Sequence, residues 1–133
     1  AAGGNENRFT PQSEIQILEY MHKQDPAKFS KFYDGLPILG VDGSLEDFGR
    51  DIPASGKVRA KPGTGVTYNA ALGKFFLITQ ALTGYVEGKN GHPWAYMVVV
   101  NNGSMPAIKD VFQIFEDQGQ LSGIIYNNTG TEK

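Results

Sequence analysis

A β-hairpin near the centre of the chain most constrains its fold. Residues 74–87 form a long run rich in β-branched and aromatic residues, and the "GKNG" sequence at 88–91 has the composition of a hairpin turn. Residues 92–102 then supply a run that is apolar at successive positions, as in a strand buried on both faces. The pattern predicts two antiparallel strands. Gly84, inside the first, indicates a bulge or a close approach of two backbones.

Two helices are predicted before the sheet. Thr10 can cap a first helical turn, and the following proline fits the first helical position. Apolar residues then recur at helical spacing. The pair Asp25-Pro26 repeats the start signal and predicts a shorter second helix, which the sequence "DGLP" ends.

A third helix is predicted toward the end of the sequence. Its apolar residues follow the i, i+3, i+4, i+7 stripe of an amphipathic helix: Ile108, Val111, Phe112 and Phe115. This helix is expected over residues 104–119, with Gly119 at its C-terminal end. The next apolar piece, residues 121–128, fits either an edge strand or a packed tail, and the sequence leaves both open.

The segment between the second helix and the hairpin completes the fold prediction. Residues 34–56 are rich in Gly, Pro and Asp and are expected to form a long ordered loop. Lys57–Lys61 alternates charged and apolar residues and predicts another strand. The predicted fold is therefore α+β, an antiparallel β-sheet meander flanked by helices, and residues 1–133 are interpreted as a single segment.

Composition excludes several functional classes. The sequence has no cysteine, which excludes disulfides, thiol catalysis and thiolate metal sites. Its formal net charge is −2, so no global positive field favours nucleic acid. The longest apolar run, Trp94–Val100, is far shorter than the ~20 residues that span a bilayer. Neither nucleic-acid binding nor a transmembrane segment is predicted.

Motifs for metals and phosphates are also missing from the sequence. His22 and His92 have no partner at metal-ligand spacing. The acidic residues 42–51 lack the pattern of a calcium loop. Residues 63–74 fail as a phosphate loop because Tyr68 stands where a glycine is required. No metal or cofactor is therefore predicted.

The remaining candidate site is Lys61-Pro62-Gly63-Thr64, where the strand that begins at Lys57 ends. A glycine beside a strand lets a ligand lie against the backbone, whose N–H groups can face a developing oxyanion. The lysine would supply positive charge for a carboxylate, and the threonine a hydroxyl for a further hydrogen bond. The same residues also fit a plain strand end with a turn, and both interpretations stay open on local sequence.

Three segments, in order, carry a family resemblance. They are "LPILGVDGSL" at 36–45, "ASGKVRAKPGT" at 54–64 and "ALTGYVEGKNGHPWAYMVVVNN" at 81–102. They resemble the C-terminal part of D-alanyl-D-alanine carboxypeptidases, low-molecular-mass penicillin-binding proteins of the kind that also act as endopeptidases. "NRFTP" at 7–11 is similar to the N-R-x-T-P helix start of the same family, which extends the resemblance to nearly the whole chain.

The resemblance implies the C-terminal part of a β-lactamase/transpeptidase-like fold and a serine-type carboxypeptidase. Such a hydrolase cleaves peptidoglycan peptides through an acyl-enzyme and binds β-lactams. By position, Lys61 would hold the substrate carboxylate and Gly63 would let the peptide lie along the strand. Thr64 would offer its N–H to the oxyanion hole and its hydroxyl to the terminal carboxylate. The resemblance also implies a periplasmic or extracytoplasmic location and no cofactor.

The sequence departs from the family pattern in three places. Pro62 occupies the middle of the K-T-G motif, where it removes an N–H and a hydroxyl and fixes φ. The segment between Thr64 and Ala81 is longer than usual, which indicates an insertion or an extended hairpin. No S-x-x-K nucleophile motif occurs, and the S-x-N motif would fall at or just before Ala1.

These departures lead to one main interpretation and two alternatives. In the main one, this chain is the C-terminal portion of a serine peptidase. The chain has no catalytic residue of its own and is inactive alone, and its partner is the N-terminal part of the same protein. Pro62 and the missing serine also allow a non-catalytic binding or interaction module of the same fold. An esterase or β-lactamase-like hydrolase is the third possibility.

Overall fold

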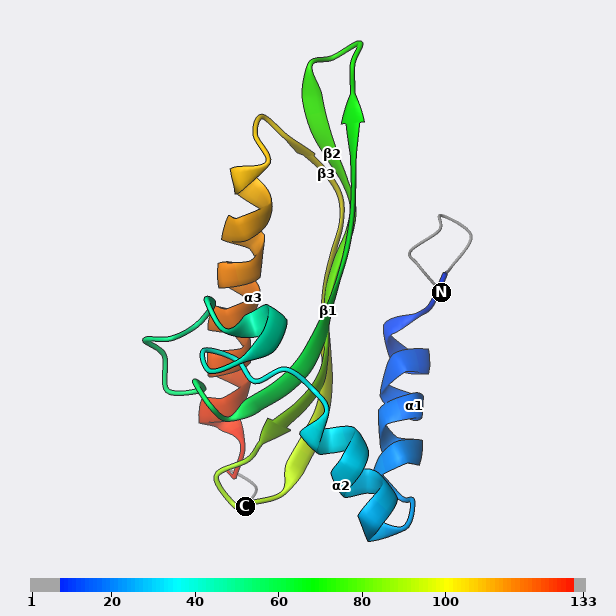
Figure 1. Ribbon diagram of the computed structural model, residues 1–133, viewed down its shortest axis with the longest axis vertical. Coiled ribbons are helices and arrows are strands. Elements are labelled where there is room, and N and C mark those ends of the chain that lie inside the picture. The colour runs from blue at the N-terminus through cyan, green and yellow to red at the C-terminus, as the bar shows by residue number, and fades with distance from the viewer. Residues whose placement is uncertain (1–7, 131–133) are drawn as a thin grey trace.

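The computed structural model describes residues 8–130, and Figure 1 shows that they form three layers. The middle layer is an antiparallel sheet in the order β1-β2-β3, with β1 at Val58–Asn69, β2 at Lys74–Glu87 and β3 at Pro93–Met105. Helices α1 (Pro11–His22) and α2 (Pro26–Asp34) lie on one face of the sheet. Helix α3 (Lys109–Asn128) and the loop before β1 lie on the other face. The predicted α+β fold, with helices flanking an antiparallel meander, is confirmed.

Both predicted helix starts are confirmed by their caps. The Thr10 hydroxyl accepts a hydrogen bond from the Ser13 N–H at 3.1 Å. The Asp25 carboxylate accepts one from the Ala27 N–H at 3.0 Å. Each side chain satisfies a backbone donor that has no partner within the first helical turn.

Residues 1–7 lie outside the described residues. They include most of the "AAGGNENR" stretch and the first residue of "NRFTP".

The prediction that a helix ends at Gly119 is wrong. Helix α3 continues to Asn128, so residues 121–128 are neither an edge strand nor a tail. Gly119 is buried, and a Cβ built on it would lie 3.6 Å from the Cα of Gly49. The glycine therefore allows the helix to pass close to the loop before β1, instead of terminating the helix.

The predicted strand at Lys57–Lys61 is too short, because β1 runs on through the K-P-G-T sequence to Asn69. It pairs with β2 along this whole length, so the long segment after Thr64 is an extended hairpin. Figure 1 shows this hairpin projecting beyond the ends of the helices. Thr79 pairs with Gly65 and Leu77 with Val66, so one residue of β2 is passed over at a β-bulge.

Gly84 marks a close approach of two backbones, one of the two options that its position in the sequence allowed. It pairs with Ala60 of β1. A Cβ on Gly84 would lie 2.2 Å from the Arg59 carbonyl oxygen and 2.6 Å from the Ala60 Cα. The register shift between β1 and β2 falls at Gly65 and Val66, so it is not caused by Gly84.

The loop before β1 is ordered because it contributes to the core under α3. Leu39, Leu45 and Ala54 are buried together with residues of all three strands. Phe48 stacks on Phe115 of α3, with ring centroids 4.7 Å apart. The loop therefore takes the place of a helix in covering part of the sheet.

Tyr85 joins the sheet to α1 and α2 on the opposite face. Its ring lies against Phe29, Phe32 and Tyr33, at centroid distances of 5.5, 6.4 and 5.6 Å. Its hydroxyl donates a hydrogen bond to the Leu18 carbonyl at 2.7 Å. One side chain thus fixes both N-terminal helices to β2.

Burial of Tyr85 predicts a loss of stability at alkaline pH. Desolvation raises the pKa of Tyr85 to about 12, above its ordinary value of 10.0. Above pH 10 the unfolded chain loses the tyrosine proton while the folded chain keeps it, so the free energy of unfolding falls as the pH rises toward 12. We expect this group to contribute at most about 2–3 kcal/mol of the fall.

Urea unfolding of wild type and Tyr85→Phe between pH 8 and pH 12 measures this contribution. The variant should be less stable near neutral pH by about 1–2 kcal/mol, because the buried hydrogen bond from Tyr85 to the Leu18 carbonyl is lost. It should also lose less stability above pH 10 than the wild type. Equal alkaline slopes for the two proteins would show that Tyr85 does not carry the effect.

Candidate functional site

The outer edge of β1 is covered over its first residues and open beyond them. The Leu39 N–H donates to the Val58 carbonyl at 3.0 Å, and the Ala60 N–H donates to the Pro37 carbonyl at 2.9 Å. Ile38 and Arg59 form an isolated antiparallel bridge at the same place. Within residues 8–130, no further strand or bridge pairs with this edge after Ala60. The open edge therefore begins at Lys61, the first residue of the candidate motif.

The alternation of an antiparallel ladder decides which backbone groups face this open edge. Every second residue of a strand directs its N–H and C=O away from the paired strand. Ala60 directs its N–H to Pro37, outside the pair of β1 and β2. Pro62 and Thr64 follow at steps of two, so the Pro62 carbonyl and the Thr64 N–H face the open edge.

Pro62 is compatible with this position in the sheet. Its nitrogen would face the open edge and not β2, so the missing N–H removes no hydrogen bond from the ladder. Pro62 is paired with Leu82 in unbroken register. The proline therefore changes what the edge offers to a ligand without disturbing the pairing of β1 with β2.

Lys61 places a positive charge at the open edge. Its side chain is exposed, and its ammonium group donates a hydrogen bond to the Pro62 carbonyl at 2.8 Å. In the described part of the chain it forms no salt bridge. An ammonium group has three N–H donors, so two remain for a ligand.

Gly63 leaves space beside the strand. A Cβ built on it would meet no atom within 4 Å. Lys61 and Gly63 lie on the α1 face of the sheet, whereas Thr64 lies on the α3 face, because successive residues of a strand alternate. The three candidate residues thus share the edge of β1 and not one face of the sheet.

The Thr64 hydroxyl is engaged by a buried partner that the sequence did not reveal. It donates a hydrogen bond to the side-chain oxygen of Gln80, which is 0% exposed. The Gln80 amide nitrogen donates to the Gln118 side-chain oxygen at 3.3 Å. Gln80 lies on the side of β2 that faces α3, and Gln118 lies on the side of α3 that faces the sheet. Nothing in the sequence identified either glutamine as a partner of Thr64.

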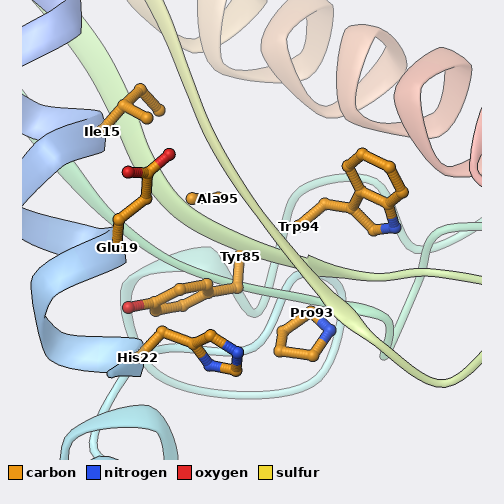
Figure 2. Close-up of a pocket in the computed structure, with 7 residues that line it drawn as sticks. All are labelled: Ile15, Glu19, His22, Tyr85, Pro93, Trp94 and Ala95. Atoms are coloured by element: carbon orange, nitrogen blue, oxygen red, sulfur yellow. The ribbon is translucent and has the colours of Figure 1, made fainter. Parts of the chain in front are cut away.

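Two cavities lie away from the motif. One, of about 220 Å³, lies between α1 and the sheet, as Figure 2 shows. Glu19 and His22 project into it from α1, while the Trp94 side chain points away from them. The other, of about 380 Å³, is lined by residues of α2 and the strand ends, including Tyr33, Arg59 and Glu87. Neither cavity includes Lys61, Gly63 or Thr64, so the assignment of these residues to a site stays a prediction.

Two of the residues lining these cavities, His22 and Arg59, contact aromatic rings. The His22 ring lies edge-on to Phe29 at 4.7 Å, and the Arg59 guanidinium lies 5.0 Å from the Tyr33 ring centre.

Among residues 8–130, no group of three His, Cys, Asp or Glu side chains could hold a metal ion. In the same residues, no helix has the length and apolar character needed to cross a membrane.

Comparisons with known proteins connect this fold to one family. The family model described as "D-Ala-D-Ala carboxypeptidase 3 (S13) family" matches residues 4–118. The crystal structure of penicillin binding protein 4 from Haemophilus influenzae superposes with a TM-score of 0.68 at 22% sequence identity, over 92% of this chain. The chain spans 25% of the length of that protein. Among curated proteins, none matches the sequence.

The family match and the structural likeness agree. The match covers the helices α1 and α2, the whole sheet and half of α3, including the open edge of β1. The similar structure has the same fold over nearly all of the chain. The chain belongs to the D-Ala-D-Ala carboxypeptidase 3 (S13) family.

Proposed function

We propose that this chain supplies the substrate-binding edge of a serine-type D-Ala-D-Ala carboxypeptidase that also acts as an endopeptidase on peptidoglycan peptides. The observation that carries the proposal is the open edge of β1 in a member of this family. On that edge lie the Lys61 ammonium group, the free side of Gly63 and the outward N–H of Thr64. An extended peptide can add to such an edge as a further strand.

Each residue has a distinct role in this proposal. Lys61 attracts the terminal carboxylate of the peptide through its two remaining N–H donors. Gly63 leaves room for the peptide backbone beside the strand. The Thr64 N–H stabilises the oxyanion that forms when the scissile carbonyl is attacked.

The nucleophile comes from outside this chain, because no S-x-x-K motif occurs in its 133 residues. The hydroxyl oxygen of this serine attacks the carbonyl carbon between the two D-alanines and forms an acyl-enzyme ester. The peptide C–N bond breaks, and the terminal D-alanine leaves with the hydroxyl proton on its amine. Water then hydrolyses the ester and restores the serine. In this proposal residues 1–133 are the C-terminal segment of an extracytoplasmic protein and are inactive alone.

Covalent labelling with a fluorescent penicillin tests the proposal. The full-length protein that contains this chain should be labelled on one serine, and peptide mapping should place that serine outside residues 1–133. The isolated chain, at the same concentration, should stay unlabelled. A folded full-length protein that penicillin does not label would contradict the catalytic proposal.

Pro62 supports one alternative, a non-catalytic module that binds the same peptides. Proline in the middle of the K-T-G motif removes a hydroxyl that could contact a ligand. Calorimetric titration of the full-length protein with a D-Ala-D-Ala peptide separates the two functions. Binding without release of D-alanine would identify the module, whereas binding with release would identify the peptidase.

A further inference from the structure

The tip of the hairpin formed by β1 and β2, residues 68–76, is apolar and open to solvent. Figure 1 shows it projecting beyond the ends of the helices. Its large apolar side chains are exposed, with Tyr68 at 56%, Leu72 at 67% and Phe76 at 36%. The proposed function uses residues 61–64 of β1 and gives the hairpin tip no role.

The exposed apolar side chains surround the hairpin tip and do not form a patch on one face. Val66 packs in the core under α3, and Tyr68, two residues further along β1, lies on the same face and contacts the Phe75 ring at 5.2 Å. Phe76, the next residue of β2, lies on the opposite face. Leu72 lies in the loop between the two strands. A groove of a protein partner would cover one face of the hairpin, whereas a lipid phase can surround it.

The backbone of the loop suits a medium with little water. The Asn69 side-chain oxygen accepts hydrogen bonds from the Ala71 N–H at 3.1 Å and from the Leu72 N–H at 3.2 Å. The Leu72 N–H also donates to the Asn69 carbonyl at 3.2 Å. Backbone donors that lose water without gaining another partner are costly. These internal partners therefore lower the cost of moving the loop into a lipid interface.

The charge of the hairpin complements an anionic surface. The chain has a net charge of −2, yet no acidic residue occurs between Asp51 and Glu87, a segment that contains β1 and all of β2 except its last residue. Lys74 follows the loop directly and is exposed. A lysine beside apolar side chains can hold its ammonium group at the level of the lipid phosphates while the apolar groups lie deeper.

We propose that the hairpin tip is a docking surface for an anionic phospholipid membrane. Leu72 enters the boundary of the acyl chains, Tyr68 and Phe76 flank it, and Lys74 pairs with lipid phosphate. One apolar loop and one lysine give reversible binding and not a permanent anchor. The inference goes beyond the proposed function and does not rest on it, because residues 61–64 take no part in the docking.

Sedimentation of the full-length protein with lipid vesicles measures the binding. The vesicles contain phosphatidylcholine alone or phosphatidylcholine with added phosphatidylglycerol, and the wild type should bind the anionic vesicles about fivefold more tightly. Leu72→Ser should weaken binding to the anionic vesicles about tenfold, because it removes the apolar side chain that enters the lipid. Leu121→Ser makes the same change at an exposed position of α3 and should bind like the wild type.

Lys74→Gln separates the contribution of charge from that of apolar contact. This variant should lose the preference for anionic vesicles and still bind phosphatidylcholine as the wild type does. Lys28→Gln, at an exposed position of α2, should keep the preference. Leu72 and Lys74 are both exposed, so their variants should fold, and thermal unfolding checks that they do.

Two results with vesicles would overturn the inference: a wild type that does not sediment with the anionic vesicles, or a Leu72→Ser protein that binds them as tightly as the wild type. Sedimentation with purified peptidoglycan that requires Leu72, without vesicle binding, would overturn it in favour of a glycan surface. Penicillin labelling of the same samples keeps the two proposals apart. Labelled protein that does not bind vesicles overturns only the lipid docking, and vesicle binding by protein that penicillin does not label overturns only the catalytic proposal.

Discussion

Gly84→Val should destabilise the fold by about 3 kcal/mol or more. A Cβ at this position would lie 2.2 Å from the Arg59 carbonyl oxygen. That atom and the nearby Ala60 Cα belong to the β1 backbone, so no side-chain rotation can relieve the clash. The two strands would have to separate where β1 leads into the candidate site. Urea unfolding followed by circular dichroism measures the loss.

Gly63→Ala is the matched control for Gly84→Val. It adds a Cβ to β1, the neighbouring strand, and no atom lies within 4 Å of that Cβ. Its free energy of unfolding should stay within about 0.5 kcal/mol of the wild type. Because the proposed peptide passes beside Gly63, the affinity for a D-Ala-D-Ala peptide should fall even though stability does not. A Gly84→Val protein as stable as Gly63→Ala would contradict the described packing of β1 on β2.

Lys61→Met should lower the rate of penicillin acylation of the full-length protein about 100-fold. The substitution keeps a side chain of similar length and removes the positive charge and all three donors. In the described residues the ammonium group contacts only the Pro62 carbonyl, and its side chain is exposed, so stability should change by less than about 0.5 kcal/mol. Stopped-flow labelling gives the rate, and thermal unfolding gives the stability.

Lys74→Met provides the control for Lys61→Met. Lys74 is also an exposed lysine in the hairpin of β1 and β2, but it lies at the first residue of β2, far along the strands from the motif. Acylation should be unchanged in this variant. If Lys74→Met lowers the acylation rate as much as Lys61→Met does, general attraction of the acidic ligand to positive charge explains the result. Lys61 would then have no specific role.

The parts of the fold that the sequence predicted are those set by local chemistry. The Thr10 and Asp25 caps each act within one turn of helix, and the bounds of β2 coincide with an uninterrupted β-rich run. The turn at 88–91 follows from its glycines in the same way. Each of these features has a signal in the residues that form it.

The missed features depend on partners that are distant in sequence. Gly119 looked like a helix end, but it lies inside α3 because Gly49, seventy residues earlier, packs against it. Likewise, β1 passes through Pro62 and Gly63 because its pairing with β2 continues across them. Propensity alone favours a turn at such residues, and tertiary pairing overrides it.

The assignment of Lys61, Gly63 and Thr64 to a site stays a prediction, and the structure adds the surroundings of these residues. Lys61, Gly63 and Thr64 were identified because their residue types fit a known motif, and the structure adds the open edge on which they lie. The hydrogen bonds from Thr64 to Gln80 and from Gln80 to Gln118 could not be predicted from the sequence. They depend on the register of β2 on β1 and on the placement of α3. Single glutamines in apolar runs do not reveal which partners they meet.

The most direct measurement of the central claim is a crystal structure of the full-length protein acylated by a penicillin. If the β1 edge binds substrate, the penicillin carboxylate should lie within about 3 Å of the Lys61 ammonium nitrogen. The acyl carbonyl oxygen should accept a hydrogen bond from the Thr64 N–H. An acylated serine whose adduct lies away from residues 61–64 would contradict the assignment of this edge, even though the protein would still bind penicillin.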